Sequence, residues 1–274
     1  MSGIINEVFC CPSCRGGLIP LSETGSGMIK TGMFRCNGCG RNYSHNGAYR
    51  DFLDNQGLIF KNRREKFFRS IYARTYTPLT NMMFIPCGGA HSARNEVMER
   101  IKIREGDTVL ETGIGYGENF LWLTSRTKGI NLHGLDIQKE MMSHCVSNLR
   151  RWNISAELAR GDAHYLPYRD STFDVVFHLG AINLFEDKGR AISEMIRVAK
   201  QGTHIVIADE TEKAGRLFNI FTGTKEKIVP PVSLVPGGMG NLSMNIIWRG
   251  YGYVIEFDVV KQEPDDSLPG QSPG

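Results

Sequence analysis

Hydrophobic and polar positions follow two periods along the chain, and the switching between them predicts the fold. From about residue 91 onward, short apolar runs such as "DTVLET" and "FDVVFHLG" follow segments whose apolar residues recur at helical spacing. Helices are predicted at 91–103, 117–127, 138–152 and 187–199, and strands at 107–112, 130–137, 156–162, 173–180 and 203–210. This alternation predicts a Rossmann-like, doubly wound α/β sheet, parallel and covered by helices.

The two ends of the chain depart from this alternation. Segments 242–250 and 251–260 are both strand-like and meet at a glycine turn, which predicts an antiparallel edge hairpin. Residues 1–56 have short extended pieces and no helical period, so we expect a small separate domain there. An amphipathic helix over 57–75 predicts a helical cap or linker at 57–90. We therefore expect the main domain at 91–262 and a disordered tail at 263–274.

Composition narrows the class of protein. The 274 residues, 41% of them hydrophobic, can bury a full core, and the net charge is only +3. Positive charge gathers at 57–76, while the rest of the chain after residue 76 is mildly acidic, which argues against a broad nucleic-acid footprint. No run approaches the roughly 20 apolar residues of a membrane helix, and the N-terminus does not read as a signal peptide. A cytoplasmic protein without a membrane span is expected.

Seven cysteines are present, and five of them lie in the first 39 residues. Cys11-x-x-Cys14 and Cys36-x-x-Cys39 form two knuckles, the arrangement that offers zinc two chelating pairs of thiolates. Four protein ligands close the coordination shell, so the predicted zinc is structural; the alternative is four reduced cysteines without an ion. Residues 10–54 resemble the small zinc-ribbon activator subunit of tRNA and release-factor methyltransferases. The resemblance implies a module able to bind a protein partner.

The stretch "VLETGIGYGENF" predicts a ligand site at the end of a strand. Gly113, Gly115 and Gly117 leave bare backbone between a strand and a helix, where a nucleotide-like ligand can cross the edge of a parallel sheet. The preceding acid, Glu111, would repel a pyrophosphate but favours a cation such as the ammonium group of S-adenosylmethionine. Asp136, 19 residues after Gly117, ends the next strand and can accept from both ribose hydroxyls. Asp162 follows the third strand and can accept from the adenine amino group.

These three elements in order resemble the class I S-adenosylmethionine-dependent methyltransferases across residues 91–210. Within that family, the segment from Leu158 to Glu210 looks most like the branch containing the ubiquinone and menaquinone biosynthesis C-methyltransferases. The resemblance implies S-adenosylmethionine as cofactor and assigns Asn183, in the loop Leu179–Phe185, to the substrate side. The full set of expected cofactor-binding residues is Glu111, Gly113, Gly115, Gly117, Asn119, Asp136, Ile137, Asp162 and Ala163.

Methyl transfer from a sulfonium is an in-line displacement, so the protein has mainly to align the acceptor and exclude water. His178 is predicted as the base, with Tyr76 and Asn183 as orienting groups; the alternative is a strand-end histidine that contacts cofactor or solvent. The loop Leu179–Phe185, Met82, Met83, Phe84 and helix 58–72 are expected to enclose a small apolar or aromatic substrate.

Two other functions stay open at this stage. Some ribosomal RNA guanine methyltransferases also place a zinc module before this fold, but here "FHLGAINLF" lacks an Asn-Pro-Pro-Tyr-type motif and is apolar. A non-enzymatic partner-binding protein with a cofactor fold is the third interpretation. The retained acids Glu111, Asp136 and Asp162 speak against a degenerate cofactor site.

Overall fold

The computed structural model describes residues 8–21, 32–53, 84–85, 88–214 and 228–261. The predicted helix 57–75, Tyr76, Met82, Met83 and the tail lie outside these residues. The strands are β1 (Leu18–Pro20), β2 (Gly32–Cys36), β3 (Asn42–His45), β4 (Arg50–Asp51), β5 (Thr108–Thr112), β6 (Asn131–Asp136), β7 (Glu157–Arg160), β8 (Val175–Leu179), β9 (His204–Glu210), β10 (Gly240–Ile247) and β11 (Gly252–Asp258). The helices are α2 (Ala90–Met98), α3 (Glu118–Arg126), α4 (Lys139–Trp152) and α5 (Lys188–Val198), with 3-10 turns η2 (Ile182–Leu184), η3 (Pro231–Leu234) and η4 (Trp248–Gly250).

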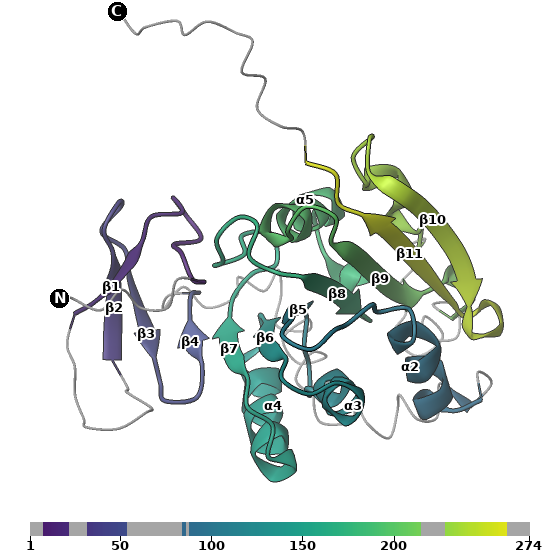
Figure 1. The fold of residues 1–274 in the computed structure, drawn as a ribbon, viewed down its shortest axis with the longest axis horizontal. Helices are drawn as coiled ribbons and strands as arrows, with labels where there is room; N and C mark the ends of the chain where they lie inside the picture. Colours follow the sequence, from purple (N-terminus) through teal and green to yellow (C-terminus); the bar gives the residue numbers. More distant parts are fainter. Residues whose placement is uncertain (1–7, 22–31, 54–83, 86–87, 215–227, 262–274) are drawn as a thin grey trace, which may run out of the picture.

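All eleven strands form one sheet in the order β1-β2-β3-β4-β7-β6-β5-β8-β9-β11-β10. The run from β4 to β9 is parallel, and the antiparallel hairpin β10–β11 closes the far edge, as the sequence predicts. Figure 1 shows the first strands at one end of the sheet and the hairpin at the other. The predicted fold class, a Rossmann-like sheet with a C-terminal hairpin, is confirmed.

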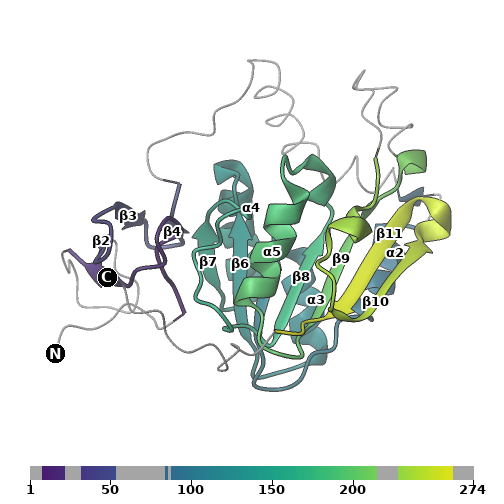
Figure 2. The same ribbon diagram turned by 90° about the horizontal axis from the view of Figure 1, so that it is seen from above.

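Alternate residues of the strands enter two separate cores. In β5, Val109 packs with residues of α2, α3 and α4, whereas Leu110 packs with residues of α5. Figure 2 shows α5 on one face of the sheet and α2 and α3 on the other. Because both faces are covered, the central strands read as nearly continuous apolar runs.

Local hydrogen bonds and backbone conformation explain where the helices begin and end. Asp187 caps α5 by accepting a hydrogen bond from the Arg190 backbone N–H at 2.8 Å. Asn153 ends α4 in the left-handed conformation, with φ of 56°. The predicted helix 91–103 ends earlier, at Met98, because the following N–H groups of Arg100 and Ile101 turn back to carbonyls three residues before them.

The first four strands, β1 to β4, are joined to the larger sheet. β4 pairs in parallel with β7, and the Phe52 N–H donates to the Arg160 carbonyl at 2.8 Å. Phe9 packs between Phe52 and Tyr168, with ring centroids 5.8 and 5.0 Å away. Residues 8–21 and 32–53 are called the ribbon below. Most of their buried side chains share one core with the α5 face of the sheet, whereas Tyr49 belongs to the core on the other face. The division of the chain at residue 56 stays a prediction.

Candidate functional site

The glycine loop after β5 turns over the end of β6. Gly113, Gly115 and Gly117 have φ of 73°, 55° and 76°, values that favour glycine. A side chain at Gly113 would meet His178 at 3.0 Å, and one at Gly117 would meet the Cys145 sulfur at 3.0 Å. Gly115 faces no atom within 4 Å. Packing thus explains two of the glycines, and the third leaves open backbone beside which a ligand can lie.

Glu111 is buried at the start of this loop. Its Oε1 accepts a hydrogen bond from Asn119 Nδ2 at 2.6 Å, while its Oε2 is buried without a protein partner. Burial raises the pKa of Glu111 to about 8. A carboxylate oxygen left in this state fits a cationic group supplied by a ligand, and the ammonium of S-adenosylmethionine is such a group.

Asp136 ends β6 beside the loop. Its Oδ2 accepts from the Gly115 N–H at 3.0 Å and its Oδ1 accepts from the Gln138 N–H at 2.8 Å. Each carboxylate oxygen has a further lone pair, so the group can still accept from two ribose hydroxyls. Its predicted neighbour Ile137 follows it in the same turn, and the Ile137 carbonyl accepts from Arg160 Nε at 3.3 Å.

Asp162 follows β7, next to the buried Ala163. Asp162 Oδ1 accepts from both the backbone N–H and the Nδ1 of His164, at 2.9 and 2.5 Å. Burial alone would raise the pKa of Asp162, but the hydrogen bonds from His164 outweigh it and the pKa is lowered. No role was assigned to His164 from the sequence alone. Its place two residues after Asp162, where it can close a local turn, was the available signal.

His178 is placed differently from the predicted base. Its Nδ1 donates to the Thr112 carbonyl at 2.6 Å, and its Nε2 accepts from the Ala181 N–H at 3.0 Å. The ring is fully buried, which lowers its pKa to about 4. Because both ring nitrogens are engaged, His178 has no free lone pair for an acceptor. We correct the prediction: His178 holds the loop after β8 against β5 and is a positioning residue.

Asn183 lies in η2, and both the nitrogen and the oxygen of its side-chain amide are hydrogen-bonded. Its Nδ2 donates to the Glu210 carbonyl at 2.8 Å, and its Oδ1 accepts from the Tyr253 hydroxyl at 3.0 Å. The Asn183 N–H also donates to Asp209, whose pKa burial raises well above its usual value. These bonds fix the loop Leu179–Phe185 and already satisfy the side-chain amide of Asn183, whose place on the substrate side stays a prediction. Phe84 packs on Trp248 with ring centroids 4.9 Å apart.

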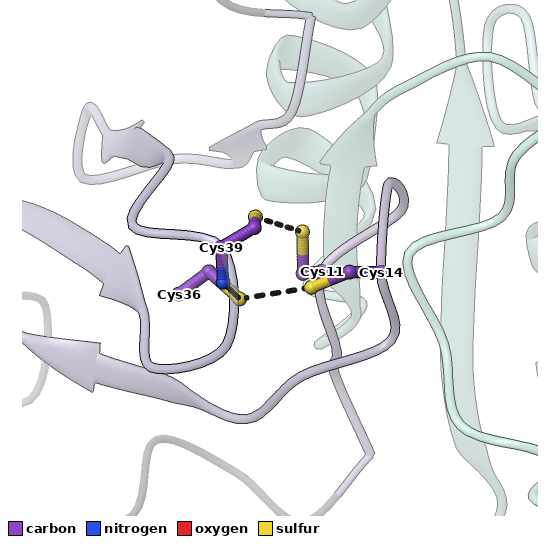
Figure 3. Close-up of side chains that lie close together, drawn as sticks. All are labelled: Cys11, Cys14, Cys36 and Cys39. Carbon is purple, nitrogen blue, oxygen red and sulfur yellow. Dashed lines mark hydrogen bonds between the residues drawn. The ribbon is translucent and has the colours of Figure 1, made fainter.

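The four predicted metal ligands come together in the ribbon (Figure 3). The sulfurs of Cys11 and Cys39 are 3.6 Å apart, those of Cys14 and Cys36 are 3.4 Å apart, and all four lie within 4.8 Å of one another. Tetrahedral zinc, with Zn–S bonds of about 2.3 Å, brings sulfurs to about this spacing. The four residues can therefore hold one zinc ion.

Two of the four cysteine sulfurs, those of Cys11 and Cys36, have hydrogen-bond partners outside the cluster. The Tyr43 hydroxyl lies 3.1 Å from the Cys11 sulfur, and the Gly38 N–H donates to the Cys36 sulfur at 3.3 Å. Burial alone would raise the pKa of Cys11, but hydrogen bonds, above all from Tyr43, lower it to about 7.

No helix among the described residues is long and apolar enough to cross a membrane.

Comparison with known proteins supports the geometry. Residues 110–207 match the family described as "Methyltransferase domain". Methyltransferase GfsG of Streptomyces halstedii is 28% identical over 48% of this chain and 47% of its own length. Demethylmenaquinone methyltransferase of Lactobacillus johnsonii is 24% identical over 61% of this chain and 70% of its own. The chain spans about half the length of the Streptomyces relative.

Solved structures share the fold. A candidate S-adenosylmethionine-dependent methyltransferase of Methanococcus maripaludis aligns with a TM-score of 0.56 and 17% identity, over 74% of this chain and 97% of that one. A chain from the complex between the Haloferax volcanii Trm112 methyltransferase activator and a methyltransferase aligns with a TM-score of 0.52 and 18% identity, over 61% and 88%. Residues 110–207, which match the methyltransferase family, include the glycine loop, Glu111, Asp136 and Asp162.

Proposed function

We propose that the chain is a class I S-adenosylmethionine-dependent methyltransferase that transfers a methyl group to a small, largely apolar or aromatic molecule, a proposal supported by the family match at 110–207 and by the demethylmenaquinone methyltransferase relative. The observation that carries the proposal is the orphaned buried oxygen of Glu111 at the mouth of the glycine loop. Asp136 ends β6, the neighbour of β5, and Asp162 follows β7, the neighbour of β6. The three acids therefore lie in the order of the ammonium, the ribose and the adenine of the cofactor. One cofactor satisfies all three acids.

The residues of this chain would then act by binding and alignment. S-adenosylmethionine supplies an electrophilic methyl group on its sulfonium. Glu111 would hold the ammonium, Asp136 the ribose and Asp162 the adenine, with the ends of β5 and β6 and the residues after β7 fixed by the sheet. Holding two reactants in line can lower a barrier by about 7–11 kcal/mol, so no covalent protein intermediate is required. Since His178 is not free, we assign no base.

The substrate side is supported by the loop after β8. Ile182 is buried, Leu184 is 66% exposed, and Phe185 packs against the rings of His164 and His178 at 5.6 and 5.2 Å. An apolar loop of this kind suits an apolar acceptor better than a charged one. Relatives include a fatty-acid O-methyltransferase of Mycolicibacterium smegmatis and the demethylmenaquinone enzyme already described, both named for small-molecule substrates.

Zinc, in this proposal, is a structural ion held by Cys11, Cys14, Cys36 and Cys39. Support comes from the sulfur spacing and from the hydrogen bonds to Cys11 and Cys36. A protein partner of the ribbon is a further part of the proposal. Ile19, Leu21 and Met33 are 42%, 48% and 43% exposed on the described part of the ribbon, which supports a docking role for it.

The test of this function is a transfer experiment. The protein is incubated with cell extract and S-adenosylmethionine carrying a ¹³C-methyl group, and small molecules and RNA are separated and analysed by mass spectrometry. We expect the label in a small molecule, with none when Asp136→Ala replaces the wild type. Label in RNA alone would contradict the small-molecule assignment, and label in neither fraction would contradict methyl transfer.

A further inference from the structure

A cavity of about 700 Å³ lies where the ribbon meets the larger part of the sheet. The ribbon contributes Arg15, Arg41 and Phe52, and the segment after β7 together with α5 contributes Asp162, Tyr165 and Arg190. Three guanidinium groups thus face one hollow against one carboxylate. The cavity adjoins the expected adenine end of the cofactor site through Asp162 and the four-cysteine cluster through Cys14, but the proposed methyl transfer does not account for its arginines.

Glu194, the acid near Arg15 and Arg190, does not neutralise their positive charge. Glu194 lies 3.7 Å from Arg15 and 3.9 Å from Arg190, yet its two oxygens accept from Nε and NH2 of Arg197, both at 2.7 Å. That two-point pair is the stronger contact, since bidentate, charge-assisted hydrogen bonds exceed a distant ion pair. Among the described residues, Arg41 makes no ion pair. The guanidinium groups of Arg15, Arg41 and Arg190 therefore keep donors for another anion.

The backbone conformation of Arg15 is a second observation that favours a ligand role for its side chain. Arg15 is left-handed, with φ of 61°, and Gly16 follows it directly. A residue with a Cβ is less favourable than glycine at such a position, which here closes the turn of the first cysteine pair, since the Arg15 N–H donates to the Cys11 carbonyl at 2.8 Å. Strain of this kind gathers at ligand sites. The side chain that accepts it here lines the cavity and is 53% exposed.

Across the hollow, an aromatic surface completes the site. Tyr165 is 52% exposed, and the Arg190 guanidinium lies 5.2 Å from the centre of its ring. Arginine donors suit phosphate oxygens, and an exposed ring beside them can stack on a flat group. The volume lies in the range of about 300–1,000 Å³ typical of small-molecule sites. A small ligand is favoured over RNA because the chain as a whole carries only +3.

We propose that the cavity between the ribbon and the methyltransferase domain is a binding site for the phosphate group of a small phosphorylated molecule. The site is separate from the methyl-acceptor side at η2 and does not depend on the proposed function. Arginines beside four zinc-bound thiolates could instead balance the negative charge of the metal centre. The test must therefore follow zinc as well as the anion.

The experiment titrates inorganic pyrophosphate into the full chain by calorimetry, at constant ionic strength and with S-adenosylhomocysteine saturating the cofactor site. Arg15→Gly removes a charge while relieving the left-handed backbone, and Arg41→Gln removes a charge without such relief. Arg104→Gln is the matched control, because Arg104 is exposed and precedes the N-terminal end of β5, whereas Asp162 of the cavity follows the C-terminal end of the parallel strand β7. Zinc content and unfolding temperature are measured for every variant.

We expect wild type and Arg104→Gln to bind pyrophosphate equally, and Arg15→Gly and Arg41→Gln to lose about tenfold in affinity or more. Arg15→Gly should keep its zinc and its unfolding temperature. The proposal is overturned if wild type binds no pyrophosphate, if the control loses as much as the two cavity variants, or if lost affinity tracks lost zinc. Binding of a short oligoribonucleotide but not of pyrophosphate would also overturn it, in favour of an RNA surface.

Discussion

Glu111 shows at the scale of one residue how a binding site can work against stability. Its carboxyl group is buried, one oxygen has no protein partner, and burial raises its pKa from 4.5 to about 8. Between these two pH values the unfolded chain ionises while the folded chain keeps its proton. Stability contributed by Glu111 is therefore present at low pH and is lost as pH rises from about 4.5 to about 8.

We predict that Glu111→Gln makes the apoprotein more stable than wild type at pH 8, with the difference shrinking toward pH 4.5, and that it weakens S-adenosylmethionine binding. Urea unfolding across this pH range and calorimetry would measure the two effects. Glu99→Gln, at an exposed position, is the control and should change neither. A Glu111→Gln variant that binds the cofactor as well as wild type would rule out the ammonium role.

Asp136 offers a second test at this scale. Its two oxygens already accept backbone hydrogen bonds, which fix the carboxylate at the end of β6. Asp136→Ala should weaken S-adenosylmethionine by roughly 1.5–3 kcal/mol, the value of a hydrogen bond to a charged group. Asp136→Asn, which keeps one carbonyl acceptor, should lose less. Equal affinities for wild type and Asp136→Ala in calorimetry would remove Asp136 from the site.

At the scale of elements, Arg160 connects the ribbon to the cofactor edge. From β7 its NH1 donates to Asp51 of β4 at 2.8 Å, and its Nε donates to the Ile137 carbonyl directly after Asp136. A second ion pair between the same strands joins Arg50 to Glu157, on which 45% of the side chain is exposed. Only the first pair reaches the loop that carries Asp136.

We predict that Arg160→Ala raises the dissociation constant for S-adenosylmethionine several-fold, by about 1 kcal/mol, although Arg160 is not placed against the ligand. Glu157→Gln weakens the neighbouring pair, in which Glu157 is 45% and Arg50 14% exposed, and should change cofactor binding little because this pair does not contact Ile137. Fluorescence or calorimetric titration would compare them. Matching losses in the two variants would mean that β4–β7 pairing in general, and not the contact to Ile137, matters.

The sequence predicted those elements whose hydrophobic pattern lies within the element itself. Apolar strands such as 175–179 and amphipathic helices such as α4 carry their own period, so their order and the hairpin were predicted correctly. β4 has only two residues, Arg50 and Asp51, and its pairing with β7 left no trace in periodicity. The motif identified Asp136 and Asp162 as candidates, but the burial of His178 depends on contacts with Thr112 and Ala181 that no spacing encodes.

For the whole molecule, the continuous sheet predicts that the four-cysteine cluster and the rest of the described sheet unfold together. The ribbon residues Phe9, Phe34 and Tyr43 share one core with Leu135, on β6. Metal held by a folded chain stabilises it by mass action, so removing zinc lowers the stability of everything in the same cooperative unit.

We therefore expect chelation, or Cys39→Ser, to lower a single calorimetric unfolding transition of the whole chain. Cys10→Ala, which removes a neighbouring thiol outside the four-cysteine cluster, should retain one zinc per chain. Two separate transitions, with the upper one insensitive to chelator, would show that the ribbon is an independent unit. Absence of stoichiometric zinc from the pure protein would refute the metal site itself.

The central claim, that the edge formed by β5, β6 and β7 binds S-adenosylmethionine, is tested most directly by calorimetric titration of the full chain with S-adenosylmethionine and, separately, with NAD. Glu111 needs a cation, and a pyrophosphate beside its carboxylate would be disfavoured. We predict one S-adenosylmethionine bound per chain, with the same affinity whether or not NAD is present. Binding of NAD without binding of S-adenosylmethionine would contradict the account.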